Sequence, residues 1–109
     1  MSTVRNILQK KGNAVYSVSP DSSVYDALED LEEKNLGGLV VVENGKLIGV
    51  FTERDYARKV VLKGKFSKDI SEAEVMHPNP VTITEDDDIQ QCMRLMTDKH
   101  IRHLPVIHD

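Results

Sequence analysis

Apolar and polar residues alternate along the first half of the chain in a way that predicts one βαββα unit. The apolar residues after Ser23 recur at helical spacing, and Ser23 itself is a favourable N-cap. Further on, Asn44-Gly45 between two apolar runs is typical of a tight β-hairpin. The predicted elements are, in order, a strand at 16–18, a helix from Val24 that ends at Gly37-Gly38, strands at 39–42 and 47–51, and a helix over 53–62 stopped by Gly64.

The same pattern returns 65 residues later, which indicates two copies of one unit. Val18 aligns with Ile83, and the match keeps apolar character first at helical and then at strand spacing. Asp109 aligns with Asn44, so the second copy stops after its second strand, and we expect a C-terminal tail that this sequence does not include. The second copy predicts a strand at 81–83, a helix after Asp88 and a strand at 104–107.

The segments outside the two copies have patterns of their own. Residues 4–11 predict a short amphipathic helix closed by Gly12, whereas the polar stretch 65–74 is typical of a loop. His-Pro-Asn-Pro at 77–80 argues against regular structure there. The expected organisation is an α+β fold with a lead helix at 1–12, a first repeat at 13–64, a linker at 65–74 and an incomplete second repeat at 75–109.

Composition narrows the classes of protein that fit. The chain has 109 residues, 39% of them hydrophobic and 29% charged, which is ordinary for a soluble domain. The longest apolar run, 39–42, is too short to span a bilayer, and the first residues lack the apolar run of a signal peptide. A lone cysteine, Cys92, fits a reducing cytoplasm. The net charge of −4 and only five aromatic residues do not favour nucleic-acid binding.

Thr52-x-x-Asp55, at the turn from a strand to a helix, is the sharpest chemical motif. Such a turn directs backbone N–H groups and a positive helix dipole to one point, which suits an anion. The same spacing is also that of an ordinary helix capping box. Both interpretations predict that Thr52 and Asp55 lie together at the start of a helix.

Three groups of residues add to this motif. Arg102 and His103 can donate hydrogen bonds to phosphate, and their counterparts in the first copy are Gly37 and Gly38, which let a ligand approach the backbone. Arg54 and Arg58 lie one turn apart and head a basic stretch that would suit a diphosphate or a dinucleotide. A solvated turn and a solvated basic helix face are the alternative interpretations. The basic stretch continues through Lys59, Lys63 and Lys65.

Catalytic and metal chemistry are not expected. His100, His103 and His108 lie close in sequence, but Cys92 belongs to an apolar helix stripe and points inward, so no convincing zinc set forms. The acidic run 85–88 is explained by helix capping and the helix dipole. No combination of nucleophile, base and acid is recognisable, and an enzyme is therefore not predicted.

The repeat, together with the runs 49–55 (Gly-Val-Phe-Thr-Glu-Arg-Asp) and 101–106 (Ile-Arg-His-Leu-Pro-Val), resembles the CBS-domain pair, named after cystathionine β-synthase. The resemblance extends over nearly the whole chain and is closest to stand-alone bacterial CBS-pair proteins with Glu-Arg-Asp-Tyr-Ala-Arg-Lys, here 53–59. It implies a pseudo-twofold unit with adenosine ligands in clefts between the repeats, and pairs that dimerise.

The resemblance also implies roles for particular residues. Thr52 would meet phosphate, and the Asp55 carboxylate would accept hydrogen bonds from ribose hydroxyls. The function expected is regulatory, energy- or redox-sensing binding of AMP, ATP or NAD(H), with no required cofactor, a homodimeric state through helices that include Met93 and Met96, and a possible regulated protein partner. The alternative is a structural homodimerisation module with a vestigial ligand site. The full set of expected ligand-binding residues is Tyr16, Ser17, Val18, Gly37, Gly38, Thr52, Arg54, Asp55, Arg58, Arg102, His103 and Pro105.

Overall fold

The computed structural model of the chain describes residues 2–12 and 14–108. The chain forms two compact units: residues 16–79 make one, and residues 1–15 together with 80–109 make the other. The predicted repeat limits at residues 13 and 109 lie outside the described residues. Within the described part of the chain, no helix is long and apolar enough to cross a membrane.

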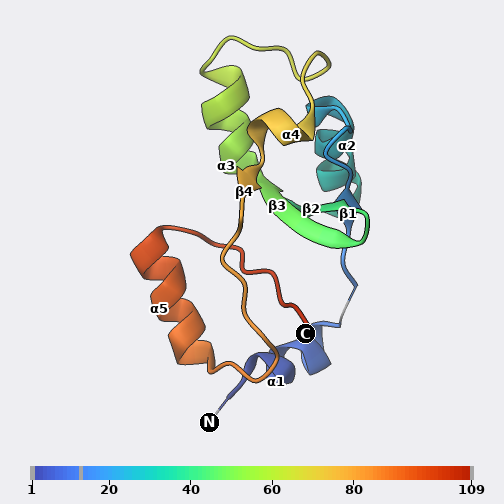
Figure 1. Cartoon of the computed structure of the whole chain (residues 1–109). Coiled ribbons are helices and arrows are strands. Elements are labelled where there is room, and N and C mark those ends of the chain that lie inside the picture. Colours follow the sequence, from blue (N-terminus) through green and yellow to red (C-terminus); the bar gives the residue numbers. More distant parts are fainter. Residues whose placement is uncertain (1, 13, 109) are drawn as a thin grey trace. The chain divides into compact units, whose positions relative to one another are not determined.

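The unit formed by residues 16–79 is a mixed four-stranded sheet with helices packed on it (Figure 1). The sheet order is β1-β2-β3-β4; β1 runs parallel to β2, and the other neighbours are antiparallel. The elements, in chain order, are β1 (Ser17–Val18), α2 (Val24–Lys34), β2 (Gly38–Glu43), β3 (Lys46–Thr52), α3 (Glu53–Tyr56), a π-helix η1 (Ala57–Val61), α4 (Glu72–Val75) and β4 (His77–Pro78).

Helix α2 begins where the sequence predicts and ends two residues earlier than predicted. The Ser23 side chain accepts a hydrogen bond from the Asp26 N–H at 3.0 Å, which satisfies one of the free donors of the first turn. At the other end Asn35 is the C-cap, with a left-handed φ of 55°. The prediction that Gly37-Gly38 ends the helix is wrong, because asparagine also tolerates this conformation.

The predicted hairpin between β2 and β3 is confirmed. Asn44 and Gly45 both have positive φ, at 52° and 77°, as a type I′ turn requires. Val41 pairs with Gly49 and Val42 with Leu47, so Ile48 is an extra residue that forms a β-bulge.

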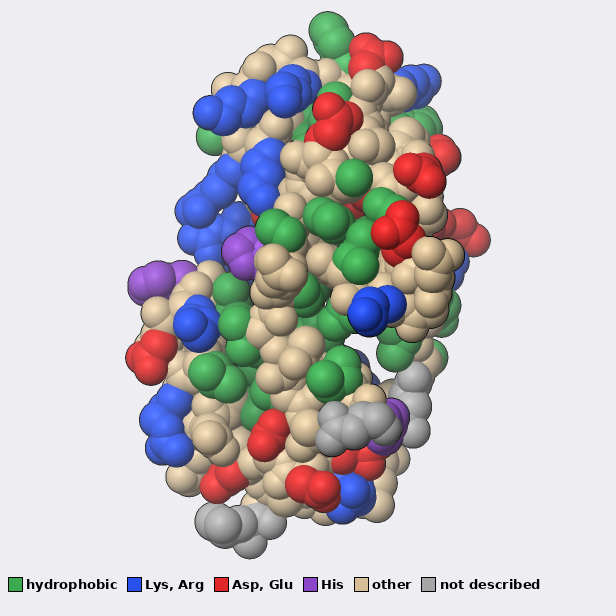
Figure 2. All heavy atoms as spheres, in the orientation of Figure 1, with side chains coloured by type: hydrophobic (Ala, Val, Ile, Leu, Met, Phe, Trp, Pro, Cys, Tyr) green, Lys and Arg blue, Asp and Glu red, His purple; other side chains and the backbone are tan. Residues whose placement is uncertain are grey.

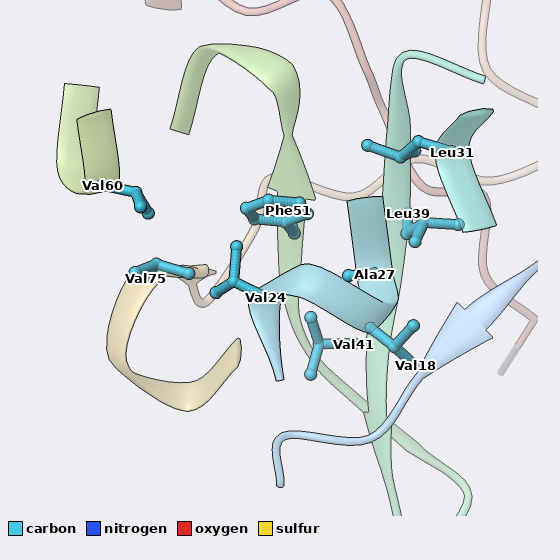
Figure 3. Close-up of a cluster of buried hydrophobic side chains, with 9 residues drawn as sticks. All are labelled: Val18, Val24, Ala27, Leu31, Leu39, Val41, Phe51, Val60 and Val75. Carbon is cyan, nitrogen blue, oxygen red and sulfur yellow. The ribbon is translucent and has the colours of Figure 1, made fainter. Parts of the chain in front are cut away.

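The core of this unit lies between the sheet and the helices. Alternate residues of β2 point inward, so that Leu39 and Val41 pack against the apolar stripe of α2. Phe51 is fully buried near the middle of the cluster (Figure 3). The buried members are Val18, Val24, Ala27, Leu31, Leu39, Val41, Phe51, Val60 and Val75.

Two elements form where the sequence predicts irregular chain. Helix α4 lies inside the expected linker, and Ser71 and Glu74 form a capping box at its start. Strand β4 includes Pro78 despite the expectation of no regular structure at 77–80. It pairs at the edge of the sheet, where a residue without an N–H is tolerated. Gly49 permits this pairing, because a Cβ atom there would lie 2.5 Å from Met76 Sδ.

The predicted helix over 53–62 is present, but its second half has π geometry. The Leu62 N–H donates to the Ala57 carbonyl oxygen, five residues back, at 3.0 Å. Gly64 follows with a left-handed φ of 69°. No spacing of apolar residues in this segment distinguishes a π-helix from an α-helix.

The other unit joins α1 (Val4–Lys11) and α5 (Ile89–Lys99) around a small core. Val4, Ile83 and Cys92 are its buried members. Backbone bonds from Val4 to Asp87 and from Arg5 to Glu85, of 3.0 and 2.9 Å, attach α1 to the segment before α5. Gly12 caps α1 as predicted.

The strands predicted for the second copy at 81–83 and 104–107 do not form. In their place Ile83 and Val106 make a single parallel bridge, held by bonds from the Ile83 N–H to the Pro105 carbonyl and from the Ile107 N–H to the Ile83 carbonyl. A physical reason is that the sequence includes no returning strand to extend this ladder, and a short isolated pair of strands is marginal in water.

The helices carry the internal repeat clearly. Both α2 and α5 have 11 residues, their N-caps are Ser23 and Asp88, and their left-handed C-caps are Asn35 and His100. Each pair is separated by the 65 residues of the sequence offset. On α5, however, Met93 is 60% exposed and lies outside the core.

Candidate functional site

One end of the sheet in the unit 16–79 brings several predicted residues together. Gly38 at the start of β2 pairs with Thr52 at the end of β3, and the Glu53 N–H donates to the Gly37 carbonyl at 3.2 Å. Because β1 runs parallel to β2, with Ser17 beside Val40, the start of β1 lies at the same end. Strand ends thus place the two glycines, the Thr52 turn and the β1 start at one edge.

The Thr52–Asp55 turn is a reciprocal capping box. The Thr52 N–H and hydroxyl both donate to Asp55 Oδ2, at 3.0 and 3.1 Å, and the Asp55 N–H donates back to Thr52 Oγ1 at 3.3 Å. These bonds fix the orientation of the carboxylate before any ligand arrives. The capping interpretation of the motif is therefore confirmed. The binding interpretation stays a prediction.

Lys59 completes the surroundings of the Asp55 carboxylate. Its Nζ lies 3.3 Å from Asp55 Oδ1 and donates to the Val75 carbonyl at 3.0 Å. A carboxylate offers about four acceptor positions, and three donors reach this one. The carboxylate thus retains capacity for a hydroxyl donor, while the lysine offsets its charge.

The backbone of this turn is less open to an anion than the sequence suggests. The Glu53 N–H is bonded to the Gly37 carbonyl, and the Asp55 N–H is bonded to Thr52 Oγ1. These two donors serve the fold, so binding of a phosphate would depend more on side-chain hydroxyl and cationic groups than on a cradle of N–H groups.

The three residues predicted to line an adenine slot differ in accessibility. Tyr16 and Ser17 are exposed, and Lys34 Nζ lies 5.1 Å from the centre of the Tyr16 ring. Val18 is buried in the core cluster, as is Phe51. A flat ligand at this edge would therefore meet Tyr16 and the backbone of β1, with the Val18 side chain committed to the core.

Basic side chains gather over α3 and η1 (Figure 2). Arg54 and Arg58 are exposed on successive turns, and Lys63 and Lys65 follow in the next exposed segment. This is a positively charged surface next to the Thr52 turn, in a chain whose net charge is −4. Such a surface attracts anionic ligands from solution.

The remaining predicted residues belong to the other unit. Arg102 and His103 are exposed, and Pro105 is half-buried, with its carbonyl accepting from the Ile83 N–H. Their assignment to a ligand site stays a prediction from the sequence.

The sequence analysis missed a buried acid close to this site. Glu72, the first residue of α4, has no exposed surface, and neither carboxyl oxygen has a hydrogen-bond partner among the residues that the structure describes. Burial, and secondarily the negative charge of Asp55, raise the pKa of Glu72 to about 8. The Ser71-x-x-Glu74 spacing could have revealed the helix, because it is a capping-box signature.

A groove of about 410 Å³ opens elsewhere on the same unit, along α2. It contains no predicted ligand residue, and its three glutamates would repel a phosphate. Its lining residues are Tyr25, Leu28, Glu29, Glu32, Glu33, Tyr56 and Ser67.

The structure offers little for metal or thiol chemistry. Across residues 2–12 and 14–108, no three His, Cys, Asp or Glu side chains are grouped closely enough to hold a metal ion. Cys92 is buried, and burial raises the pKa of its thiol, so the unreactive protonated form is favoured.

Comparison with known proteins agrees with this architecture. The CBS domain family matches residues 4–62 and 70–109. A CBS-domain protein from Burkholderia ambifaria has the same fold, with a TM-score of 0.94 and 39% identity over 98% of this chain and 81% of its own. The CBS domain pair of protein MJ0100, in complex with 5-methylthioadenosine and S-adenosyl-L-methionine, is 26% identical with a TM-score of 0.88, over 100% of this chain and 82% of its own.

A curated relative gives the same result. The CBS domain-containing protein CBSX3, mitochondrial, of Arabidopsis thaliana is 36% identical over 99% of this chain. The chain spans 57% of the length of that relative. The fold and the matches define a regulatory module of mixed α and β structure. The chain belongs to the CBS-domain family, with two repeats.

Proposed function

We propose that this chain is a regulatory module that binds an adenine nucleotide, AMP, ATP or NAD(H), at the sheet edge formed by β1, β2 and the Thr52–Asp55 turn. The carrying observation is the Asp55 carboxylate, which Thr52 and Lys59 hold in one orientation beside two glycines at the starts and ends of paired strands. A pre-oriented acceptor of this kind suits the hydroxyls of a ribose, because no side-chain order must be gained on binding.

The proposal assigns the other parts of a nucleotide to neighbouring groups. The exposed Tyr16 and the backbone of β1 would contact the adenine, and Arg54 and Arg58 would contact the phosphates. Gly37 and Gly38 would let the ligand approach the backbone without meeting a Cβ atom. That the related MJ0100 pair was obtained with two adenosine compounds supports this class of ligand.

A second candidate function is a structural homodimerisation module, which the exposed apolar side chains favour. Val61, Leu62 and Phe66 are 53%, 77% and 74% exposed and lie within a few residues of one another. We propose that these residues take part in a homodimer interface, whether or not a ligand binds. A cytoplasmic location, in a compartment that keeps Cys92 reduced, is part of the same proposal.

A thermal-shift screen separates the two functions. At a ligand concentration about ten times the Kd, an adenine nucleotide is expected to raise Tm by about 5–10 °C, because only the folded chain binds it. The screen uses AMP, ATP, NAD⁺ and NADH, with guanosine monophosphate as the base-specificity control. No shift with any adenine nucleotide at millimolar concentration would leave the structural function as the better account.

A further inference from the structure

Glu72 occupies a position where an ionised acid has no support. Its side chain is fully buried, and both carboxyl oxygens lack hydrogen-bond partners within the described ranges 2–12 and 14–108. A buried carboxylate without such partners is strongly disfavoured relative to the neutral acid. The side chain is therefore a protonated carboxyl group at neutral pH, consistent with a pKa raised to about 8.

The helix that carries Glu72 is tied to the proposed ligand site by its other end. The Val75 carbonyl, one turn along α4, accepts from Lys59 Nζ at 3.0 Å, and the same Nζ lies 3.3 Å from Asp55 Oδ1. On its other side α4 is tied to the start of α2, where the Glu72 N–H donates to the Ser22 carbonyl at 2.8 Å. A displacement of α4 would therefore be felt by Lys59 and, through it, by Asp55.

The charged groups around Glu72 make its proton matter. Asp55 on α3 is close enough to raise the pKa of Glu72, and Lys59 on η1 supplies a positive charge already shared between Asp55 and α4. The start of α2 contributes Ser22 and Val24, which do not titrate, and Glu74 on α4 is held by Ser71. Loss of the Glu72 proton would place two carboxylates near a single lysine.

We propose that Glu72, Lys59 and Asp55 form a proton-dependent latch between α4 and the Thr52–Asp55 turn. With Glu72 protonated, α4 stays docked and Lys59 holds Asp55. With Glu72 ionised, the two acids compete for Lys59, α4 loosens, and the added negative charge weakens binding of an anionic nucleotide. The last step rests on the proposed function; the latch itself does not.

The latch predicts a particular pH dependence of stability. An acid whose pKa is raised in the folded state loses stability as pH rises from about 4.5 to about 8, because only the unfolded chain releases its proton in that range. Glu72→Gln keeps the size of the side chain and has no proton to lose. Its Tm is expected to match wild type near pH 4.5 and to exceed it by about 4–8 °C at pH 9.

The control for this series is Asp69→Asn, which removes an exposed carboxylate from the segment before α4. Its Tm difference from wild type should not change with pH above about 5. If glutamine at position 72 weakens the fold at every pH, Glu72→Met gives the same comparison with an apolar side chain of similar length. A Tm difference that is flat from pH 4.5 to 9 in both variants overturns the latch.

Titration with AMP tests the link to the ligand site. The AMP phosphate is fully ionised above about pH 7.5, so its charge does not change in the range used. Wild-type affinity should fall about three- to tenfold more than that of Glu72→Gln between pH 7.5 and 9. Equal falls in the two proteins contradict the link. If AMP binds neither protein, the proposed function fails, while the Tm series still decides the latch.

Discussion

Replacing Phe51 with alanine is expected to lower the free energy of unfolding by about 3–5 kcal/mol, the largest effect of any single substitution in the unit 16–79 that we predict. Phe51 has no exposed surface and lies in the middle of the cluster formed by α2, η1, α4 and the sheet. The alanine would remove contacts with three layers of the core at once and leave a cavity. Since small domains have only about 5–15 kcal/mol in total, the variant would be marginally folded.

Urea denaturation followed by circular dichroism measures this loss. The matched control is Phe66→Ala, which truncates a phenylalanine that is 74% exposed. It should change the free energy of unfolding of the isolated chain by less than about 0.5 kcal/mol. Similar losses in the two variants would mean that the core is not organised around Phe51.

Asp55→Ala is expected to weaken binding of the adenine nucleotide by tenfold to hundredfold, or about 1.4–2.8 kcal/mol. The substitution removes the acceptor proposed for the ribose hydroxyls and releases Thr52 and Lys59, which the carboxylate now holds. It also removes the capping box of α3, at a cost of about 1 kcal/mol in stability. Calorimetric titration at a temperature well below Tm separates the loss of affinity from the loss of fold.

Asp26→Ala is the matched control for this experiment. Asp26 lies in the first turn of α2, three residues after the N-cap Ser23, as Asp55 follows Thr52, but it is exposed and its carboxylate is not part of the proposed site. Its nucleotide affinity should stay within about twofold of wild type. An unchanged affinity in Asp55→Ala, with the protein folded, would remove Asp55 from the site.

The sequence predicts the hairpin and the repeated helices well because local chemistry determines them. Asn44-Gly45 adopts the two positive φ angles that a tight turn requires, and the N-caps of α2 and α5 satisfy donors within their own first turns. The buried positions of α2 follow from helical spacing alone. These features depend on few residues and hardly at all on distant contacts.

The sequence predicts poorly the elements that depend on distant partners. Strand β4 exists because β3 offers an unpaired edge and Gly49 leaves room for Met76, neither of which is visible in the segment 77–80. Conversely, the strands of the second copy have suitable sequences but reach only the bridge between Ile83 and Val106. Pairing, more than propensity, decides in both cases.

The candidate site divides in the same way. Thr52 and Asp55 are found from their spacing, because a capping box is local. The contribution of Lys59 depends on where η1 directs its side chain, and that of Glu72 depends on burial beneath neighbouring elements. A glutamate in a polar stretch of sequence gives no sign that it will be enclosed, so such a residue is recognised only in three dimensions.

Calorimetric titration of the wild-type chain with AMP, ATP, NAD⁺ and NADH tests most directly whether the edge beside Thr52 and Asp55 receives a phosphorylated adenosine. We predict saturable binding of at least one of them with a Kd in the micromolar range, about −8 kcal/mol. Absence of binding heat for all four at millimolar concentration, with the protein shown to be folded, would contradict the account.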